Sequence, residues 1–243
     1  MDLFSLRGRT ALVTGARSGI GRAIALGLAD AGAELVLLGR TADFGEVPDA
    51  VVGTVVVDLA DPAAIESALA PVLAERRIDV LVNNAGTIHR EPAVDVSLTD
   101  WRRIMAVNLD SVFELSRVVG GRMLDGGGKI VNIASLLSFQ GGVTVPAYSA
   151  SKHAVAGLTK ALANEWAPHN VQVNAIAPGY IATDNTADLR ADPGREPAIR
   201  GRIPAGRWGT PEDVVGAAVF LSSRASDYVN GHVLVVDGGW LGR

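Results

Sequence analysis

Apolar residues form short runs that alternate with longer stretches in which apolar positions recur every three or four residues. The short runs are rich in β-branched residues and lack a polar face, as in Val80-Leu81-Val82. This pattern is typical of strands buried on both sides of a parallel sheet. The predicted strands span residues 10–14, 34–38, 54–57, 80–83, 129–134, 171–177 and 233–236.

Helical patterns lie between these strands. Ile20, Ile24 and Leu28 recur every four residues, as do Ala150, Ala154, Leu158 and Leu162. The alternation predicts a single α/β domain over residues 1–243, a Rossmann-type doubly wound sheet of about seven parallel strands with helices on both faces. One irregular stretch, residues 178–211, is long enough to predict a substrate lid. The alternative is a surface excursion.

Composition narrows the class of protein. The chain of 243 residues has 22 Lys and Arg against 26 Asp and Glu, a net charge of −4, which argues against nucleic-acid binding. Cysteine is absent, which excludes disulfides and thiolate catalysis. Without the apolar run of a leader or a membrane span, the sequence predicts a cytoplasmic protein. No metal is expected, because ligand spacing is missing among His89, His153, His169 and His232.

A glycine motif follows the first predicted strand. The residues are Thr14-Gly15-Ala16-Arg17-Ser18-Gly19-Ile20-Gly21, with a helical pattern directly after them. Glycines at these positions allow a sharp turn and let a pyrophosphate approach the first N–H groups of a helix. The cofactor-binding residues predicted here are Gly15, Arg17, Ser18, Gly19, Ile20 and Gly21; the alternative is a plain strand-to-helix turn.

The second predicted strand runs into Leu38-Gly39-Arg40. An NAD-binding unit usually carries Asp or Glu near this point, where it bonds the ribose 2′-hydroxyl. Here Arg40 follows, with Arg17 available from the glycine motif, and guanidinium groups pair well with a 2′-phosphate. The sequence therefore favours NADP(H) over NAD(H), although Arg40 as a solvated loop residue stays open.

Polar residues follow two further strands. Asp58-Leu59 and Asn84-Ala85-Gly86 both fall where strands end, the edge at which open α/β sheets bind ligands. We expect Asp58 to accept from an adenine amino group, and Asn84 and Gly86 to face the cofactor.

Tyr148 and Lys152 are one turn apart on a predicted helix, an arrangement also common on helix surfaces. Ser135 follows the strand at 129–134, and Asn108 lies inside a helix predicted to start near Thr99. With the glycine motif and Asn83-Asn84-Ala85-Gly86, these residues resemble the classical short-chain dehydrogenase/reductase family, over essentially the whole chain.

The resemblance implies transfer of a hydride between a nicotinamide and an alcohol or ketone. Tyr148 would be the general acid/base, and Lys152 would lower its pKa and bind the nicotinamide ribose. Ser135 would stabilise the developing alkoxide, and Asn108 would hold a water that links Lys152 to solvent. Further cofactor contacts are implied for Pro178, Gly179, Ile181 and Thr183, although Pro178-Gly179 also serves as a turn.

Within that family, residues 135–142, 163–166, 180–190, 202–209 and 237–241 look most like the enzymes acting on gluconate, 2-deoxygluconate or 2-keto-3-deoxygluconate. A sugar acid needs a cation for its carboxylate and polar groups for its hydroxyls. Candidate substrate residues, beside Ser135 and Tyr148, are Arg90, Gln140, Tyr180, Asn185, Arg202, Arg207 and Trp240. For Arg207 the alternative is an ion pair with Glu212 or another acid that fixes the lid.

Two other functions stay open. A β-ketoacyl thioester reductase of the same family would need a basic patch for its acidic carrier. A non-enzymatic dinucleotide-binding protein would be expected to lack part of the Asn108, Ser135, Tyr148 and Lys152 set. The resemblance also implies a homotetramer assembled through helices near residues 99–120 and 146–166.

Overall fold

A computed structural model describes residues 2–243, which form one parallel sheet in the order β3-β2-β1-β4-β5-β6-β7. The chain adds strands to one side of β1 up to β3 and then returns to the other side with β4, so the strand order reverses between β1 and β4. Folds of this kind bind ligands in the crevice at such a switch point. The strands are β1 (Thr10–Thr14), β2 (Glu34–Gly39), β3 (Val51–Val56), β4 (Val80–Asn83), β5 (Gly128–Ile133), β6 (Val171–Pro178) and β7 (Val233–Val236).

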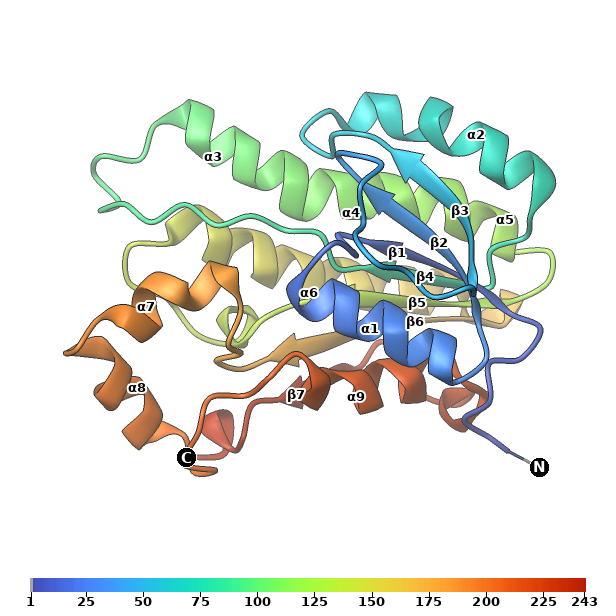
Figure 1. Ribbon diagram of the computed structural model, residues 1–243. Helices are drawn as coiled ribbons and strands as arrows, with labels where there is room; N and C mark the ends of the chain where they lie inside the picture. Colours follow the sequence, from blue (N-terminus) through green and yellow to red (C-terminus); the bar gives the residue numbers. More distant parts are fainter. Residues whose placement is uncertain (1) are drawn as a thin grey trace.

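Helices cover both faces of this sheet (Figure 1). They are α1 (Gly19–Asp30), α2 (Ile65–Glu75), α3 (Leu98–Met105), α4 (Ser111–Leu115), α5 (Gly121–Met123), α6 (Pro146–Trp166), α7 (Ala187–Ala191), α8 (Arg195–Arg202) and α9 (Glu212–Ser222). Two π-helical turns, Ala106–Asp110 and Ser116–Gly120, join α3, α4 and α5 into one long rod. No helix among residues 2–243 is long and apolar enough to cross a bilayer.

Alternating residues along a strand pack into two apolar cores, one on each face of the sheet. Ala11 and Val13 of β1 pack on the α1 and α9 side, whereas Leu12 packs on the side of α2, α4 and α6. All five residues of β1 are buried. This explains why the strand reads as a continuous apolar run without polar alternation.

The doubly wound sheet predicted from the sequence is confirmed. Three strands have the predicted bounds, and the largest difference is β3, which begins at Val51, three residues earlier than expected. Thr54 and Val56 of β3 are exposed, so this edge strand lacks the two-sided burial on which the prediction relied. The expected irregular stretch at 178–211 contains the short helices α7 and α8, which project from the carboxyl end of the sheet.

Candidate active site

The glycine turn is packed tightly against the end of β4. The amide of Asn84 donates to Thr14 O at 2.9 Å, and the Thr14 hydroxyl accepts from the backbone N–H groups of Asn84 and Ala85 at 3.0 and 2.9 Å. A Cβ on Gly21 would lie 2.3 Å from Asn84 Nδ2 and 2.4 Å from Gly15 O. Only glycine fits at position 21, so the cradle predicted from the motif is a built feature.

The start of α1 is open to an anion. Ser18 is its N-cap in extended conformation, and its side chain makes no capping hydrogen bond. Uncapped N–H groups and the helix dipole favour a phosphate at this point. Gly19 faces the segment 178–211, because a Cβ there would contact Thr183 Cγ2 at 3.4 Å. The glycine turn and one predicted nicotinamide-side residue are therefore neighbours.

The loop after β2 contains a residue that sequence reasoning missed. Asp43 pairs with Arg17 at 3.1 Å, both side chains being largely exposed. Arg17, predicted to help bind a 2′-phosphate, thus already has a carboxylate partner. Arg40 is exposed and makes no ion pair among residues 2–243, which leaves it as the cation at this end of the site.

Other predicted cofactor residues lie along the same edge of the sheet, but they differ in whether a side chain or only the backbone is available to a ligand. Asp58 is exposed and caps Ala60 N at 3.0 Å, while the Leu59 side chain belongs to the core. The Ile181 side chain is buried in the other core, so only its backbone can reach a ligand. Gly179 packs closely on Asp237, whose Cα would be 2.7 Å from an added Cβ. Ile20 lies in the first turn of α1 and Pro178 ends β6, while Ala85 packs against the second core.

Asn108 lies in the first π-helical turn and is fully buried. Its amide donates to Thr87 O at 2.9 Å and to Ser151 Oγ at 3.2 Å, and its carbonyl accepts from Thr87 N at 2.8 Å. Both amide hydrogens are therefore used within the protein, and the side chain fixes the loop after β4. The water relay expected of Asn108 stays a prediction.

Gly86 brings the loop and the catalytic helix together. A Cβ on Gly86 would lie 3.4 Å from Asn108 Oδ1 and 3.8 Å from Lys152 Nζ. Three predicted site residues, from the loop after β4, the π-helical turn and α6, thus meet at one point. π-Helical turns occur frequently at functional sites, and here the turn carries Asn108 to this junction.

Lys152 and Tyr148 face each other on α6. The Lys152 ammonium lies 5.6 Å from the centre of the Tyr148 ring and donates to Ile133 O at 2.6 Å. Burial lowers the pKa of Lys152 to about 8. Burial also raises the pKa of Tyr148, against smaller lowering effects of the Ser135 hydroxyl and the Arg90 charge.

The direction for Tyr148 is opposite to the one expected from the sequence. The family resemblance implied that the Lys152 charge would lower the pKa of the phenol. In the structure desolvation outweighs nearby charge, and the groups that counteract it are Ser135 and Arg90. The sequence could place the two side chains on one face but could not give their burial.

Ser135 is oriented to donate a hydrogen bond. It follows β5 in extended conformation, and its oxygen accepts from Leu137 N at 3.1 Å. Because that bond uses a lone pair, the hydroxyl hydrogen is left for an acceptor beside Tyr148. The role of Ser135 as a donor to an alkoxide stays a prediction.

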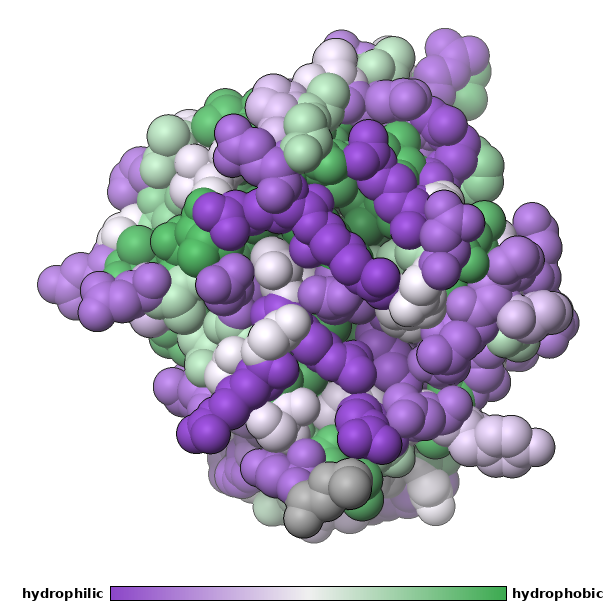
Figure 2. Space-filling view, turned by 90° about the vertical axis from the view of Figure 1, so that its right-hand side faces the viewer, coloured by the Kyte–Doolittle hydropathy of each residue, from purple (hydrophilic) through white to green (hydrophobic). Residues whose placement is uncertain are grey.

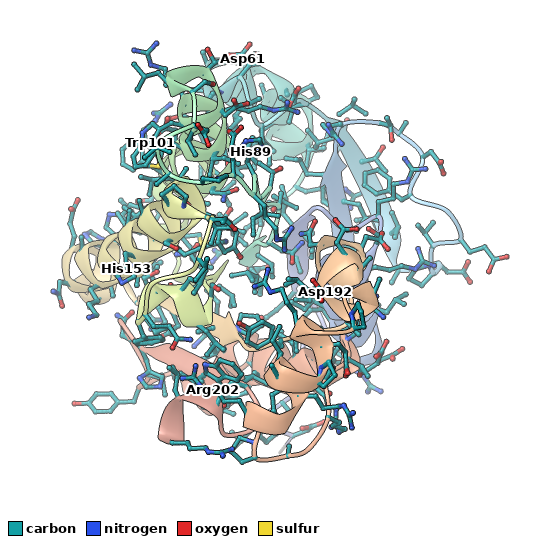
Figure 3. The ribbon with its side chains drawn as sticks, turned by 90° about the vertical axis from the view of Figure 1, so that its left-hand side faces the viewer. Asp61, His89, Trp101, His153, Asp192 and Arg202 are labelled. Atoms are coloured by element: carbon teal, nitrogen blue, oxygen red, sulfur yellow. The ribbon has the colours of Figure 1, made fainter. Side chains whose placement is uncertain are left out.

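The predicted substrate residues divide into two groups. Arg90 follows β4, and its guanidinium donates to Asn185 O in the segment 178–211 at 2.8 Å, while its charge lowers the pKa of Tyr148. Gln140 lies just after the short turn that follows Ser135. Figure 3 looks onto the carboxyl-end face of the sheet, where the labels of Asp192 and Arg202 mark the segment 178–211.

The remaining substrate candidates have partners of their own. Trp240 is 5% exposed, with the Arg202 guanidinium 4.1 Å above its ring and Tyr180 4.7 Å away. Its ring is therefore covered, and a role as a platform for a sugar ring has no support here. Arg207 pairs with Asp213 at 2.6 and 2.9 Å. That is the alternative predicted for Arg207, with Asp213 in place of Glu212.

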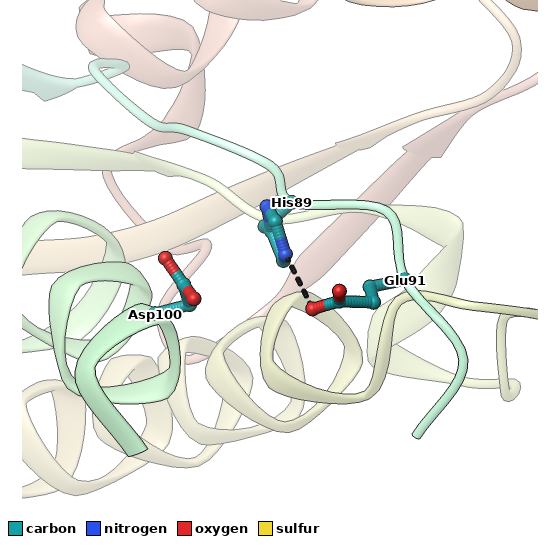
Figure 4. Close-up of side chains that lie close together, drawn as sticks. All are labelled: His89, Glu91 and Asp100. Atoms are coloured by element: carbon teal, nitrogen blue, oxygen red, sulfur yellow. Dashed lines mark hydrogen bonds and ion pairs between the residues drawn. The ribbon is translucent and has the colours of Figure 1, made fainter. Parts of the chain in front are cut away.

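Three possible metal-ligating groups lie close together near the loop after β4. The ligand atoms of His89, Glu91 and Asp100 are all within 4.8 Å of one another (Figure 4). His89 Nε2 is 3.0 Å from Glu91, and Asp100 accepts from the Ser97 hydroxyl at 2.5 Å at the start of α3. Each group thus has a local partner.

The glycine cradle at the switch point, with Tyr148, Lys152 and Ser135 beside it, defines a dinucleotide-dependent oxidoreductase that acts on CH–OH groups. The chain belongs to the short-chain dehydrogenase/reductase family. A family profile described as enoyl-(acyl carrier protein) reductase matches residues 15–241.

Curated relatives and solved structures cover nearly the same length. The 2-dehydro-3-deoxy-D-gluconate 5-dehydrogenase of Bacillus subtilis is 55% identical, over 100% of this chain and 98% of that protein. The gluconate 5-dehydrogenase of Gluconobacter oxydans is 46% identical, over 98% and 96%. The crystal structure of a gluconate 5-dehydrogenase from Burkholderia cenocepacia, in complex with NADP and tartrate, has a TM-score of 0.94 at 39% identity, over 100% and 98%.

Proposed function

We propose that this enzyme interconverts a secondary alcohol and a ketone on a sugar acid, with 2-dehydro-3-deoxy-D-gluconate (2-keto-3-deoxygluconate) as first candidate and gluconate and 2-deoxygluconate next. The observation that carries the proposal is the pair of groups acting on Tyr148, the Ser135 hydroxyl and the Arg90 charge. The Ser135 hydroxyl can donate to the carbinol oxygen of the substrate, and the Arg90 guanidinium can pair with its carboxylate. The names of the relatives support the same substrate class.

In the oxidative direction, the Tyr148 phenolate takes the hydroxyl proton of the substrate while Ser135 donates to the same oxygen. The bound nicotinamide supplies the acceptor for the hydride that leaves the carbinol carbon. The C–H electron pair leaves with the hydride as the O–H pair becomes the carbonyl bond, so charge balances. Lys152, held by Ile133 O, is the expected ligand of the nicotinamide ribose.

Positive charge around the lid fits an anionic substrate. Arg90 already contacts the lid backbone at Asn185, and Arg195 and Arg202 lie close enough to lower the pKa of Tyr180 against the larger effect of burial. A substrate carboxylate near Arg90 would connect the loop after β4 with the segment at 178–211. This supports that segment as a lid within a single domain.

NADP(H) is the favoured cofactor, with NAD(H) as the alternative. The supporting observation is the exposed Arg40 beside the glycine cradle, without an acidic residue at the end of β2. NADP is present in the crystal structure of the Burkholderia cenocepacia gluconate 5-dehydrogenase.

A homotetramer in the cytoplasm completes the proposal. Phe113, 48% exposed, lies with Leu109 and Leu158 around a hollow of about 540 Å³ on the α4 and α6 face. An apolar hollow on the helices implied by the family resemblance supports their use between subunits. Light scattering of the purified enzyme, and of a Phe113→Asp variant, tests this part alone.

The catalytic proposal is tested by turnover. Purified enzyme is assayed with 2-dehydro-3-deoxy-D-gluconate, D-gluconate, 2-deoxy-D-gluconate and acetoacetyl thioester, each with either dinucleotide, and with Tyr148→Phe as the inactive control. We expect kcat/KM to be greatest for a sugar acid. Faster turnover of the thioester would replace the proposal with a β-ketoacyl thioester reductase. Dinucleotide binding without turnover of any substrate would favour the non-enzymatic alternative.

A further inference from the structure

A second polar pocket lies at the opposite end of the sheet from the active site. It has a volume of about 450 Å³ and is bordered by the residues that precede β1, β4, β5 and β6, together with the chain after α9. Figure 2 looks onto this amino-end face and shows long hydrophilic side chains across its middle. Its charged lining residues are Arg7, Arg9, Arg77, Lys129, Arg224, Asp79 and Asp227.

Positive charge exceeds negative charge in this lining, although the whole chain has a net charge of −4. Even without Arg224, four cationic side chains face two carboxylates. Asp79 is fully engaged, because it accepts from Arg77 and from Thr10 N, each at 2.9 Å. The remaining excess lies on Arg7 and Arg9, which make no ion pair with a described carboxylate of residues 2–243.

Lys129 forms the floor of the pocket. It is 2% exposed, and its ammonium donates to Asp227 at 2.8 Å. Burial lowers the pKa of Lys129, and Arg9 acts in the same direction against the opposing effect of Asp227. Asp227 is itself largely exposed, so water screens its charge and weakens its attraction for the Lys129 ammonium. A buried ammonium with cationic neighbours is costly in free energy, and an anion in the pocket would reduce that cost.

From this arrangement we infer that the amino-end pocket is a binding site for a small phosphorylated metabolite, separate from the dinucleotide and sugar-acid site. Phosphate fits because guanidinium groups from Arg7 and Arg9 can bond two of its oxygens while Lys129 supplies a point charge. The volume is in the range of small-ligand pockets. The excess of charge suits a dianionic phosphoryl group better than one carboxylate.

Pyrophosphate is the probe for the first test. Thermal unfolding and calorimetric titration of the full-length enzyme at low ionic strength measure its stabilisation and its Kd. We expect the Tm to rise by about 5 °C at saturating pyrophosphate, with no comparable rise in potassium chloride of equal ionic strength. In the double variant Arg7→Gln, Arg9→Gln, we expect Kd to increase at least about tenfold, since two charge-assisted contacts are lost.

The cofactor site is the main competing site for pyrophosphate, so a charge-matched variant controls for it. Arg17→Gln, Arg40→Gln removes the same charge from the opposite end of the sheet and should leave the pyrophosphate Kd unchanged. Loss of binding in this control but not in the Arg7, Arg9 variant would assign the ion to the cofactor cradle and overturn the inference. Equal weakening in both variants would show unspecific charge attraction, which also overturns it.

Lys129→Met provides an independent variant. If it folds, as circular dichroism will show, its pyrophosphate Kd should rise at least as much as in the double variant; unchanged binding would overturn the inference. Because these measurements need no turnover, their outcome does not depend on the proposed sugar-acid reaction. Titration of glucose 6-phosphate against glucose in the same assay then separates a phosphorylated metabolite from free phosphate: stronger binding of the sugar phosphate than of inorganic phosphate supports the inference, and weaker binding contradicts it.

Discussion

The ammonium of Lys152 lies 5.6 Å from the centre of the Tyr148 ring, and its hydrogen bond is to the Ile133 carbonyl. Burial acts on both groups, raising the pKa of the phenol and lowering that of the ammonium to about 8. Desolvation therefore opposes the charged form of each. Ionisation of the phenol depends on the donors and charges around it, which Ser135 and Arg90 supply.

The pH dependence of oxidation should show this balance. Since the pKa of Tyr148 is raised and the phenolate is the reactive base, kcat/KM for alcohol oxidation should still be rising near pH 10, the ordinary value for tyrosine. Ser135→Ala removes the hydroxyl that lowers this pKa, so the rising limb should move to higher pH as kcat falls.

Ser149→Ala is the matched control, because the Ser149 hydroxyl is buried without a hydrogen-bond partner among the described residues. Its profile should follow that of the unchanged enzyme. A Ser135→Ala profile with the same midpoint would contradict the role of this hydroxyl in setting the pKa of Tyr148.

Lys152 should make stability depend on pH in a defined direction. Its pKa falls from 10.5 to about 8 on folding, so between these values the unfolded chain binds more protons. The free energy of unfolding contributed by Lys152 therefore rises with pH over this interval, by about 3 kcal/mol in total. Below about pH 8 the folded state bears the full cost of a buried ammonium.

The prediction is measured as a difference between variants. The stability of Lys152→Met minus that of the unchanged enzyme, from urea unfolding, should decrease by about 3 kcal/mol between pH 7 and pH 10.5. Lys160→Met, at an exposed lysine of the same helix, is the matched control for the loss of one lysine. If the difference for Lys152→Met were constant with pH, burial of the Lys152 ammonium would not destabilise the folded state.

The fold was predictable because burial on both faces leaves a local signal. Val80-Leu81-Val82 reads as a strand without knowledge of its neighbours, and the structure buries all three side chains. β3 shows the limit of this reasoning, because Thr54 and Val56 at the sheet edge are exposed and carry no such signal. The switch point then follows from strand order, and with it the end of the sheet that binds ligands.

The sequence predicted the arrangement of candidate site residues only where they lie close together in one local motif. Tyr148 and Lys152 share a helix face by spacing, whereas the pairing of Arg17 with Asp43 and of Arg207 with Asp213 depends on loop paths. Burial was also beyond the reach of the sequence: Trp240, a candidate substrate residue, is buried and lies beneath Arg202. No local pattern distinguishes a covered ring from an available one.

Gly21→Ala tests the cofactor cradle. Its Cβ would lie 2.3 Å from Asn84 Nδ2 and 2.4 Å from Gly15 O, so the turn must open or Asn84 must leave its bond to Thr14. We expect loss of dinucleotide binding by at least about tenfold and destabilisation of about 1–3 kcal/mol from overpacking. Gly201→Ala is the control, because a Cβ there meets nothing within 4 Å, and dinucleotide titration should find it unchanged. Normal binding by Gly21→Ala would show that the cradle does not hold the pyrophosphate.

Arg40→Ala should change the choice between the two dinucleotides. Arg40 is exposed beside the cradle, and a guanidinium paired with a 2′-phosphate contributes to NADP(H) binding but little to NAD(H) binding. We expect the KM for NADP to rise about tenfold, equivalent to about 1.4 kcal/mol, while the KM for NAD changes little.

Arg17→Ala should have a smaller effect, because Arg17 already pairs with Asp43 at 3.1 Å. Asp43→Asn releases Arg17 from this pair and should lower the KM for NADP. Equal changes of both KM values in Arg40→Ala would exclude Arg40 as the group that recognises the 2′-phosphate and would favour NAD(H) as the cofactor.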